Sequence, residues 1–155
     1  MIDRPHDHPL LLACRRLGRA MDLYDDACCR VLDLNRSDLR ALNLLEEGPV
    51  PMRAIAEALG LTPGSVTPLV DRLVRRGWVR RVPSEEDRRS TSVRLEPEAR
   101  QALARVYEPL GRGVLGAFVH RSERERARMA AGMEQTADAF DRGRAELLTA
   151  RRSRS

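Results

Sequence analysis

A tight turn at residues 60–63, between two short helical patterns, constrains the fold of this chain more than any other feature. Before the turn, the apolar residues of 51–59 fall on one face of a predicted helix. Gly60 follows as a residue that adopts the left-handed conformation of a helix end at little cost. Thr62 and Pro63 then form an N-cap and a first-turn proline, which predict the start of a second helix.

This second predicted helix has a buried stripe and a polar opposite face. Its apolar residues recur at the i, i+3, i+4, i+7 spacing of a helix and are Val66, Leu69, Val70, Leu73 and Val74. Gly77 marks its end. The opposite face carries short, polar and cationic groups, namely Gly64, Pro68, Asp71, Arg72 and Arg75, with Ser65 and Thr67 beside them. Such a face can approach a groove floor or a phosphate.

Two short strands are predicted after the second helix, at residues 78–82 and 91–95. The alternation of Thr91, Val93 and Leu95 has the period of two that is typical of a strand. The charged loop PSEEDRRS joins the two segments. A helix-turn-helix followed by such a ribbon predicts a winged helix-turn-helix lobe over residues 35–96, in a chain that is mainly α-helical.

Further helices flank this lobe on both sides. Apolar stripes at helical spacing are predicted at 9–32, 97–119 and 123–149, and a helix over 38–47 begins the lobe, capped by Ser37. Ser122 and Glu125 form a capping box ahead of the last helix. The terminal stripes would be exposed in a single chain, so residues 9–34 and 97–149 are predicted to form a helical dimerisation region. The tails 1–8 and 150–155 are expected to be disordered.

Composition restricts the partners. The chain has 28 Lys and Arg against 23 Asp and Glu, a net charge of +5, and this favours an anionic partner. Aromatic residues make up 3% of the chain, which disfavours stacking on single-stranded bases.

No apolar run is long enough to span a membrane, and the first residues lack a signal-peptide pattern. Three cysteines, two of them adjacent, do not suggest a disulfide framework, so a cytoplasmic protein with reduced thiols is expected. No catalytic motif is present, and a non-enzyme without cofactors is expected.

The chain resembles the MarR (multiple antibiotic resistance regulator) family of dimeric winged-helix repressors over residues 35–125. The resemblance is carried by LTPGSVTPLVDRLVRRGWVRR and by EEDRRSTSVRLEPEA, which match the family's recognition helix and its D-R-R wing. It implies a homodimer that binds double-stranded DNA at a pseudo-palindromic operator and represses transcription in response to a small ligand.

The resemblance and the exposed helix face together suggest DNA-contacting residues. They are Thr62, Gly64, Ser65, Thr67, Pro68, Arg72 and Arg75 on the second helix, and Asp87, Arg88 and Arg89 in the wing. By resemblance, Arg89 enters the minor groove and Asp87 orients it. Arg72 is the expected reader of guanine, or alternatively the partner of a nearby acid such as Glu57.

The family also implies a cleft for a small effector, for which the candidates are Cys14, Met21, Asp22 and Leu42. Each of these residues has an ordinary core or surface interpretation as well. A redox-responsive regulator acting through Cys14 and a metal-responsive one remain alternatives of the same fold, although no metal-ligand set is recognised around His6, His8 or His120. A winged-helix adaptor that binds proteins instead of DNA is the alternative from another class.

Overall fold

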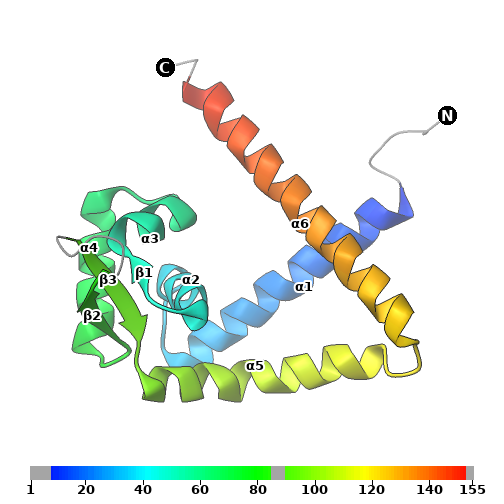
Figure 1. The fold of residues 1–155 in the computed structure, drawn as a ribbon, viewed down its shortest axis with the longest axis horizontal. Coiled ribbons are helices and arrows are strands. Elements are labelled where there is room, and N and C mark those ends of the chain that lie inside the picture. The colour runs from blue at the N-terminus through cyan, green and yellow to red at the C-terminus, as the bar shows by residue number, and fades with distance from the viewer. Residues whose placement is uncertain (1–7, 85–89, 153–155) are drawn as a thin grey trace. The chain divides into compact units, whose positions relative to one another are not determined.

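The chain is mainly helical with one small antiparallel sheet, as the sequence predicted. The computed structural model describes residues 8–84 and 90–152 (Figure 1). In chain order the elements are α1 (Pro9–Leu32), α2 (Arg36–Leu44), the 3-10 turn η2 (Leu45–Glu47), β1 (Val50–Pro51), α3 (Met52–Leu59), α4 (Pro63–Arg75), β2 (Val79–Pro83), β3 (Thr91–Leu95), α5 (Pro97–Ala117) and α6 (Glu123–Arg152).

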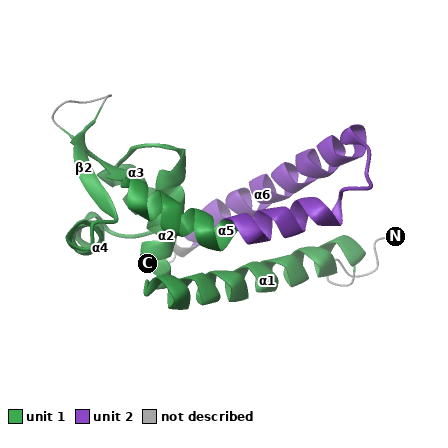
Figure 2. Cartoon of the chain, turned by 90° about the horizontal axis from the view of Figure 1, so that it is seen from below, with its two compact units in different colours: residues 1–107 green, residues 108–155 purple. Residues whose placement is uncertain are grey.

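The chain divides into two compact units, residues 1–107 and 108–155, and the boundary lies inside α5 (Figure 2). The first unit contains α1, the winged lobe and the beginning of α5. The second contains the end of α5 and α6. The dimerisation role assigned above to 9–34 and 97–149 stays a prediction.

The hydrophobic core lies in the first unit and joins α2, α3 and α4 to the sheet. Its largest fully buried side chains are Leu39, Leu42, Leu45, Ile55, Leu73, Leu103, Val66, Val70, Val79 and Val93. These are aliphatic residues with few rotamers, which fill a core densely without aromatic rings. The core therefore fixes α4 against the lobe and leaves its other face to solvent.

Local signals set the helix ends around the turn as predicted. Gly60 has φ 66°, and its backbone N–H reaches the carbonyls of the last turn of α3. Thr62 has an extended backbone and its hydroxyl accepts a hydrogen bond from the Ser65 amide, so it is the N-cap of α4. Gly77 also lies in the left-handed region, with φ 69°, and follows Arg76, the C-cap of α4.

The start of α2 differs from the prediction. Asn35, and not Ser37, is the N-cap, and its side-chain oxygen accepts from the Asp38 amide at 2.9 Å. Both residue types cap helices well, so the sequence alone did not separate them. The helix ends at Leu44 and continues as η2, earlier than the predicted end at residue 47.

The sheet has three strands in the order β1-β3-β2, where the sequence predicted two. The strands β2 and β3 are antiparallel, with Val79 opposite Leu95 and Arg80 opposite Arg94. The additional strand, β1, has only two residues and pairs Val50 with Val93.

The second unit has no buried residue among those that the structure describes. α5 continues through Pro109 to Ala117, and α6 begins at Glu123. The capping box is confirmed: the Ser122 amide donates to Glu125 at 2.8 Å, and the Glu125 amide donates to the Ser122 hydroxyl at 3.3 Å. The Ser122 hydroxyl also donates to the Glu125 carboxylate at 2.7 Å, and this hydrogen bond, together with the one from the Ser122 amide, lowers the pKa of the Glu125 carboxyl.

Candidate nucleic-acid interface

The face of α4 opposite the core is exposed and carries six of the residues predicted to contact DNA. They are Thr62, Gly64, Ser65, Thr67, Pro68 and Arg75. Pro68 lies inside the helix, where it removes one backbone donor. Because Pro68 is exposed, water can satisfy the carbonyl that this donor would have reached, and α4 continues to Arg75.

The first turn of α4 is ordered by its own hydroxyls. The Thr62 and Ser65 hydroxyls lie 2.9 Å apart in a hydrogen bond, in addition to the cap between the Thr62 hydroxyl and the Ser65 amide. Gly64 has open space around the position of a Cβ, with Thr62 Oγ1 the nearest atom at 3.9 Å. This turn therefore presents small groups that a phosphate or a base edge can approach closely.

Arg72 is tied to the lobe by a buried carboxylate. Its Nη2 and Nε donate to the two oxygens of Asp38 at 2.5 and 3.0 Å. Asp38 is 1% exposed, whereas the Arg72 side chain is 39% exposed. These hydrogen bonds raise the pKa of the Arg72 guanidinium. Arg72 is thus held in one orientation at the edge of the helix face.

The prediction of Glu57 as the alternative acidic partner of Arg72 was wrong, because the partner is Asp38. Glu57 instead lies one turn from Arg53 in α3 and accepts from its Nε at 2.9 Å. From its sequence position, Asp38 is only the first residue of the helix predicted over 38–47. The pair could not be predicted from spacing, because the two residues are 34 positions apart and only the packing of α2 on α4 brings them together.

A depression of about 400 Å³ lies between the start of α2 and α4. It is lined by Ser65, Pro68 and Arg72 from α4 and by Asn35, Arg36 and Ser37 from the other side. Arg36 also pairs with the carboxylate of Asp22 at 2.8 Å. The sequence interpretation missed Asn35 and Arg36 as neighbours of the recognition face, since only the spacing within α4 was considered.

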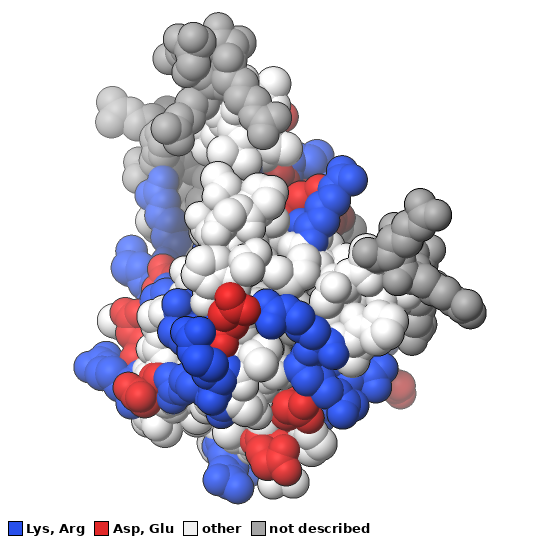
Figure 3. Space-filling view, turned by 90° about the vertical axis from the view of Figure 1, so that its left-hand side faces the viewer, with Lys and Arg blue, Asp and Glu red and all other residues white. Residues whose placement is uncertain are grey.

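Several other arginines of the lobe have partners within it. Arg81 donates to Asp71 at 2.6 Å. Arg76 binds the backbone carbonyls of Leu32 and Asp33 and lies over the ring of Trp78. Basic side chains consequently lie beside acidic ones on the face that carries α4 and the sheet, and do not form one uninterrupted patch (Figure 3). The predicted wing residues Asp87, Arg88 and Arg89 lie outside the described residues.

The predicted effector residues lie in different environments. Leu42 is fully buried in the lobe core, so it presents no surface to a ligand in this structure. Met21 and Asp22 are exposed on α1, and Cys14 is half-buried there. The depression between α2 and α4 is lined by none of these four residues.

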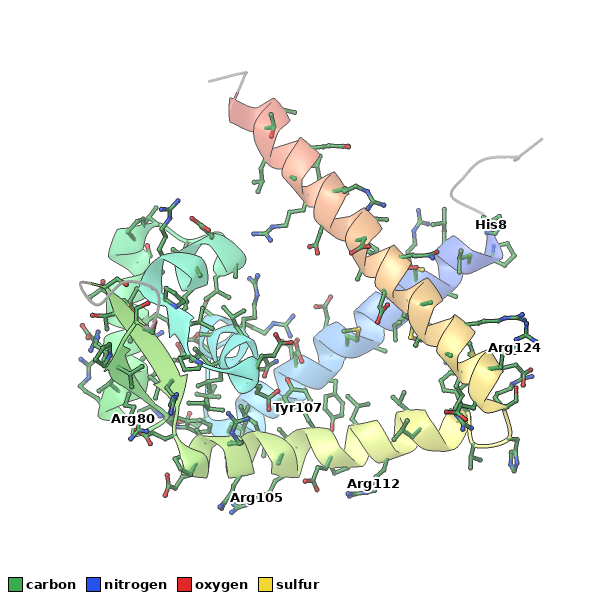
Figure 4. All side chains as sticks on the ribbon, in the orientation of Figure 1. His8, Arg80, Arg105, Tyr107, Arg112 and Arg124 are labelled. Carbon is green, nitrogen blue, oxygen red and sulfur yellow. The ribbon has the colours of Figure 1, made fainter. Side chains whose placement is uncertain are left out.

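A polar cluster that the sequence interpretation missed joins α1, α2 and α5 at Tyr107 (Figure 4). The Tyr107 hydroxyl donates to Asp25 at 3.1 Å and accepts from the Asn43 amide at 3.0 Å. Tyr24 donates to the Val106 carbonyl at 2.5 Å. Burial raises the pKa of the Tyr107 hydroxyl, and burial also raises the pKa of the nearby Cys28 thiol. The cluster fixes α1 and α5 to the lobe.

Within residues 8–84 and 90–152, no three His, Cys, Asp or Glu side chains are placed to hold a metal ion. Over the same ranges, no helix has the length and apolar character needed to cross a bilayer.

Comparisons with known proteins agree on one family. The family model described as MarR family matches residues 32–90. The HTH-type transcriptional regulator YcgE of Bacillus subtilis is 31% identical over 102 residues, which are 65% of this chain and 66% of that protein. The matches span between 49% and 66% of the curated relatives' lengths. These relatives are transcriptional regulators and not enzymes, which confirms the expectation of a non-enzyme.

Solved structures show the same fold. A mutant of MepR from S. aureus has a TM-score of 0.71 at 18% identity, covering 86% of this chain and 99% of that one. Another MepR mutant, bound to an oligodeoxyribonucleotide, has a TM-score of 0.55 at 18% identity over 86% of this chain and 99% of that chain. The winged helix-turn-helix architecture predicted from the sequence is therefore confirmed.

Proposed function

The chain belongs to the MarR family of transcriptional regulators, and on this premise we propose that it binds double-stranded DNA sequence-specifically through α4 and the wing. The observation that carries the proposal is the exposed face of α4, where short polar residues and Arg75 stand clear of the core. A helix of this kind fits the major groove of B-form DNA. The MepR mutant bound to an oligodeoxyribonucleotide, which shares this fold, supports the same assignment.

Within α4, small residues and arginines have different proposed roles. Ser65, Thr67 and Pro68 would approach base edges, since they lie on the exposed face and carry short side chains. Arg75, at the last turn, would contact a backbone phosphate. Arg72 would donate to guanine while part of its guanidinium stays hydrogen-bonded to Asp38. The orientation of the Arg72 side chain would therefore be set before DNA binds.

The wing would supply a second contact. Asp87, Arg88 and Arg89 follow β2 in the sequence, and the proposed role of Arg89 is insertion into a narrow minor groove with Asp87 orienting it. A narrow A·T-rich groove concentrates negative potential, which favours a guanidinium there.

We further propose that the functional form is a homodimer. Large apolar side chains remain exposed on α1 and on the helices of the second unit, among them Leu17, Met21, Leu115, Met133, Phe140 and Leu147. A second copy would cover them, as contiguous apolar patches on a monomer mark association sites. Two α4 helices would then read half-sites about one helical turn apart on a pseudo-palindromic operator.

We also propose that the protein is a repressor and that a small effector releases it from DNA. Cys14, Met21 and Asp22 on α1 remain the candidate contacts, and Leu42 would take part only if the lobe core opened. Such an effector would act through its different affinity for the DNA-binding and the released conformations.

The test is binding of the purified protein to the intergenic DNA upstream of its own gene, followed by footprinting over a range of salt concentrations. We expect two protected half-sites and affinity that falls steeply with salt, because phosphate contacts release counterions. Arg75→Ala and Arg89→Ala should weaken binding, whereas the control Arg112→Ala, on the exposed end of α5, should not.

Two rival functions give different results in this assay. An adaptor that binds proteins would leave no footprint at any salt concentration. A redox-responsive regulator would lose its footprint in peroxide and keep it in the Cys14→Ser variant.

A further inference from the structure

We propose that the outer face of the wing, where it meets α5, binds an organic anion with an apolar body. The site is a depression of about 440 Å³ formed by β2, β3 and the beginning of α5. Three arginines from these three elements line it, together with apolar residues; they are Arg80, Arg94, Arg100, Leu95, Pro97 and Ala104. This site goes beyond the proposed DNA-binding function and uses none of its residues.

Two of the arginines are forced close together by the strand register. Arg80 and Arg94 are directly opposite in the antiparallel pair β2–β3, so their side chains leave the same face of the sheet. Like charges in this arrangement repel each other. Arg80 lies where the wing meets the start of α5 (Figure 4), and α5 adds Arg100 from its first turn. An anion between these groups would remove the repulsion.

The existing contacts leave this positive charge largely uncompensated. The carboxylate of Glu96 lies 3.8 Å from Arg80 Nε, which is a loose pair. Arg100 donates to the Glu46 backbone carbonyl, a neutral acceptor, at 3.0 Å. Within the described ranges, Arg94 forms no ion pair. Among the described residues, Glu96 is the one carboxylate that pairs with any of the three guanidinium groups, and these groups attract a carboxylate or phosphate strongly.

The aliphatic residues that line the depression indicate that the ligand has an apolar part. Pro97 is exposed and Ala104 is half-buried, and both line the depression from α5. A bare inorganic ion would leave this surface in water. Small-molecule sites combine an apolar lining with a few polar groups that fix orientation, and this depression has both.

The direction of the side chains favours a small anion over the DNA duplex. Successive residues of a strand point to opposite faces, and Arg81, between Arg80 and Val82, points toward α4 and binds Asp71. Arg80 and Arg94 therefore point away from α4. A duplex seated on the exposed face of α4 lies on the other side of the sheet.

Calorimetric titration of the full chain at low salt with phenyl phosphate and with phenylacetate tests the proposal. Inorganic phosphate and benzyl alcohol separate the contributions of the charge and the ring. We expect saturable binding of the two organic anions, weaker binding of inorganic phosphate and none of benzyl alcohol. Trp78, the single tryptophan, accepts a backbone hydrogen bond from Glu96 and gives a second readout by its fluorescence.

Three variants locate the site. Arg94→Gln should weaken phenyl phosphate binding by about tenfold or more, since it removes a charged hydrogen-bond donor. The matched control Arg105→Gln removes the same charge from α5 at an exposed position outside the lining and should change nothing. Glu96→Gln should strengthen binding, because it removes the competing carboxylate.

Three results would overturn the proposal. The first is no saturable binding of either organic anion to the wild-type protein. The second is equal weakening by Arg94→Gln and Arg105→Gln, which would indicate binding to net charge alone. The third is a loss of duplex affinity in Arg94→Gln without any effect on phenyl phosphate, which would make Arg94 a DNA-backbone contact. The absence of an operator footprint with the wild-type protein would instead refute the DNA-binding function, and it would not affect the proposal of this anion site.

Discussion

The winged lobe and the residues after Tyr107 use their apolar side chains in opposite ways. In the lobe, Leu39, Leu42 and Leu73 are completely buried. In the second unit, Leu115, Phe140 and Leu147 are between 68% and 75% exposed. Both regions have apolar residues at helical spacing, so the difference lies in whether a partner surface exists within the same chain. The lobe should therefore be stable by itself, whereas the order of the outer helices should depend on protein concentration.

The largest effect is expected in the lobe core. Leu73→Ala removes a fully buried side chain on the inner face of α4 and should lower the free energy of unfolding by about 2–5 kcal/mol. Urea unfolding followed by circular dichroism measures this. The control Leu147→Ala, at an exposed position of α6, should leave unfolding of the lobe unchanged; an equal loss would show that the two regions form one cooperative core.

Self-association should depend on the outer helices. Leu147→Glu places a charge in the apolar surface of α6 and should weaken dimerisation at least about tenfold, because a buried unpaired charge is costly. Sedimentation velocity over a concentration series measures the change. Arg142→Gln on the same helix, which also lowers the net charge by one, is the control for charge alone. A wild-type chain that stays monomeric at all concentrations would end the contrast between the two regions.

A smaller effect should distinguish the two candidate caps of α2. Asn35→Ala removes the observed cap and should cost about 1 kcal/mol of unfolding free energy. Ser37→Ala should cost much less, since its hydroxyl does not cap the helix. Chemical unfolding of both variants provides the comparison, and the reverse order would restore Ser37 as the cap.

The alkylation rates of the three cysteines should differ with their burial. Burial raises the pKa of Cys28 and of Cys29, so little thiolate forms at neutral pH and alkylation should be slow. Cys14 is only partly buried on α1 and should react first. Mass spectrometry after timed iodoacetamide treatment resolves the order. Rapid modification of Cys28 would mean that α1 separates readily from the lobe.

Features encoded by adjacent residues could be predicted from the sequence. The turn at Gly60, the Thr62 cap and the Ser122–Glu125 capping box each depend on residues within a few positions, and the structure contains all three. The two-residue strand β1 was missed because it is too short to show a period of two. Its position follows from pairing with β3 and not from its own sequence.

The candidate interface could likewise be predicted only where it depends on residues close in the sequence. The exposed face of α4 followed from helical spacing, whereas the Arg72–Asp38 pair and the Tyr107 cluster depend on tertiary packing between distant segments. A single Asp in the first turn of a helix is expected to interact with the positive end of the helix dipole. No sequence pattern indicates that it is buried against an arginine of another helix. The family model matches residues 32–90, the part of the chain that contains the turn at Gly60 and the Thr62 cap predicted from adjacent residues.

The edges of the sheet limit how copies of this chain can join. β1 is two residues long and contains Pro51, and the other edge strand, β2, ends in Pro83. Proline has no amide hydrogen to offer a neighbouring strand, so these borders resist lengthening of the sheet by a second molecule. Crowding of this protein in a cell should then favour helix-mediated pairing over amyloid-like stacking, which keeps the wing free for its ligands.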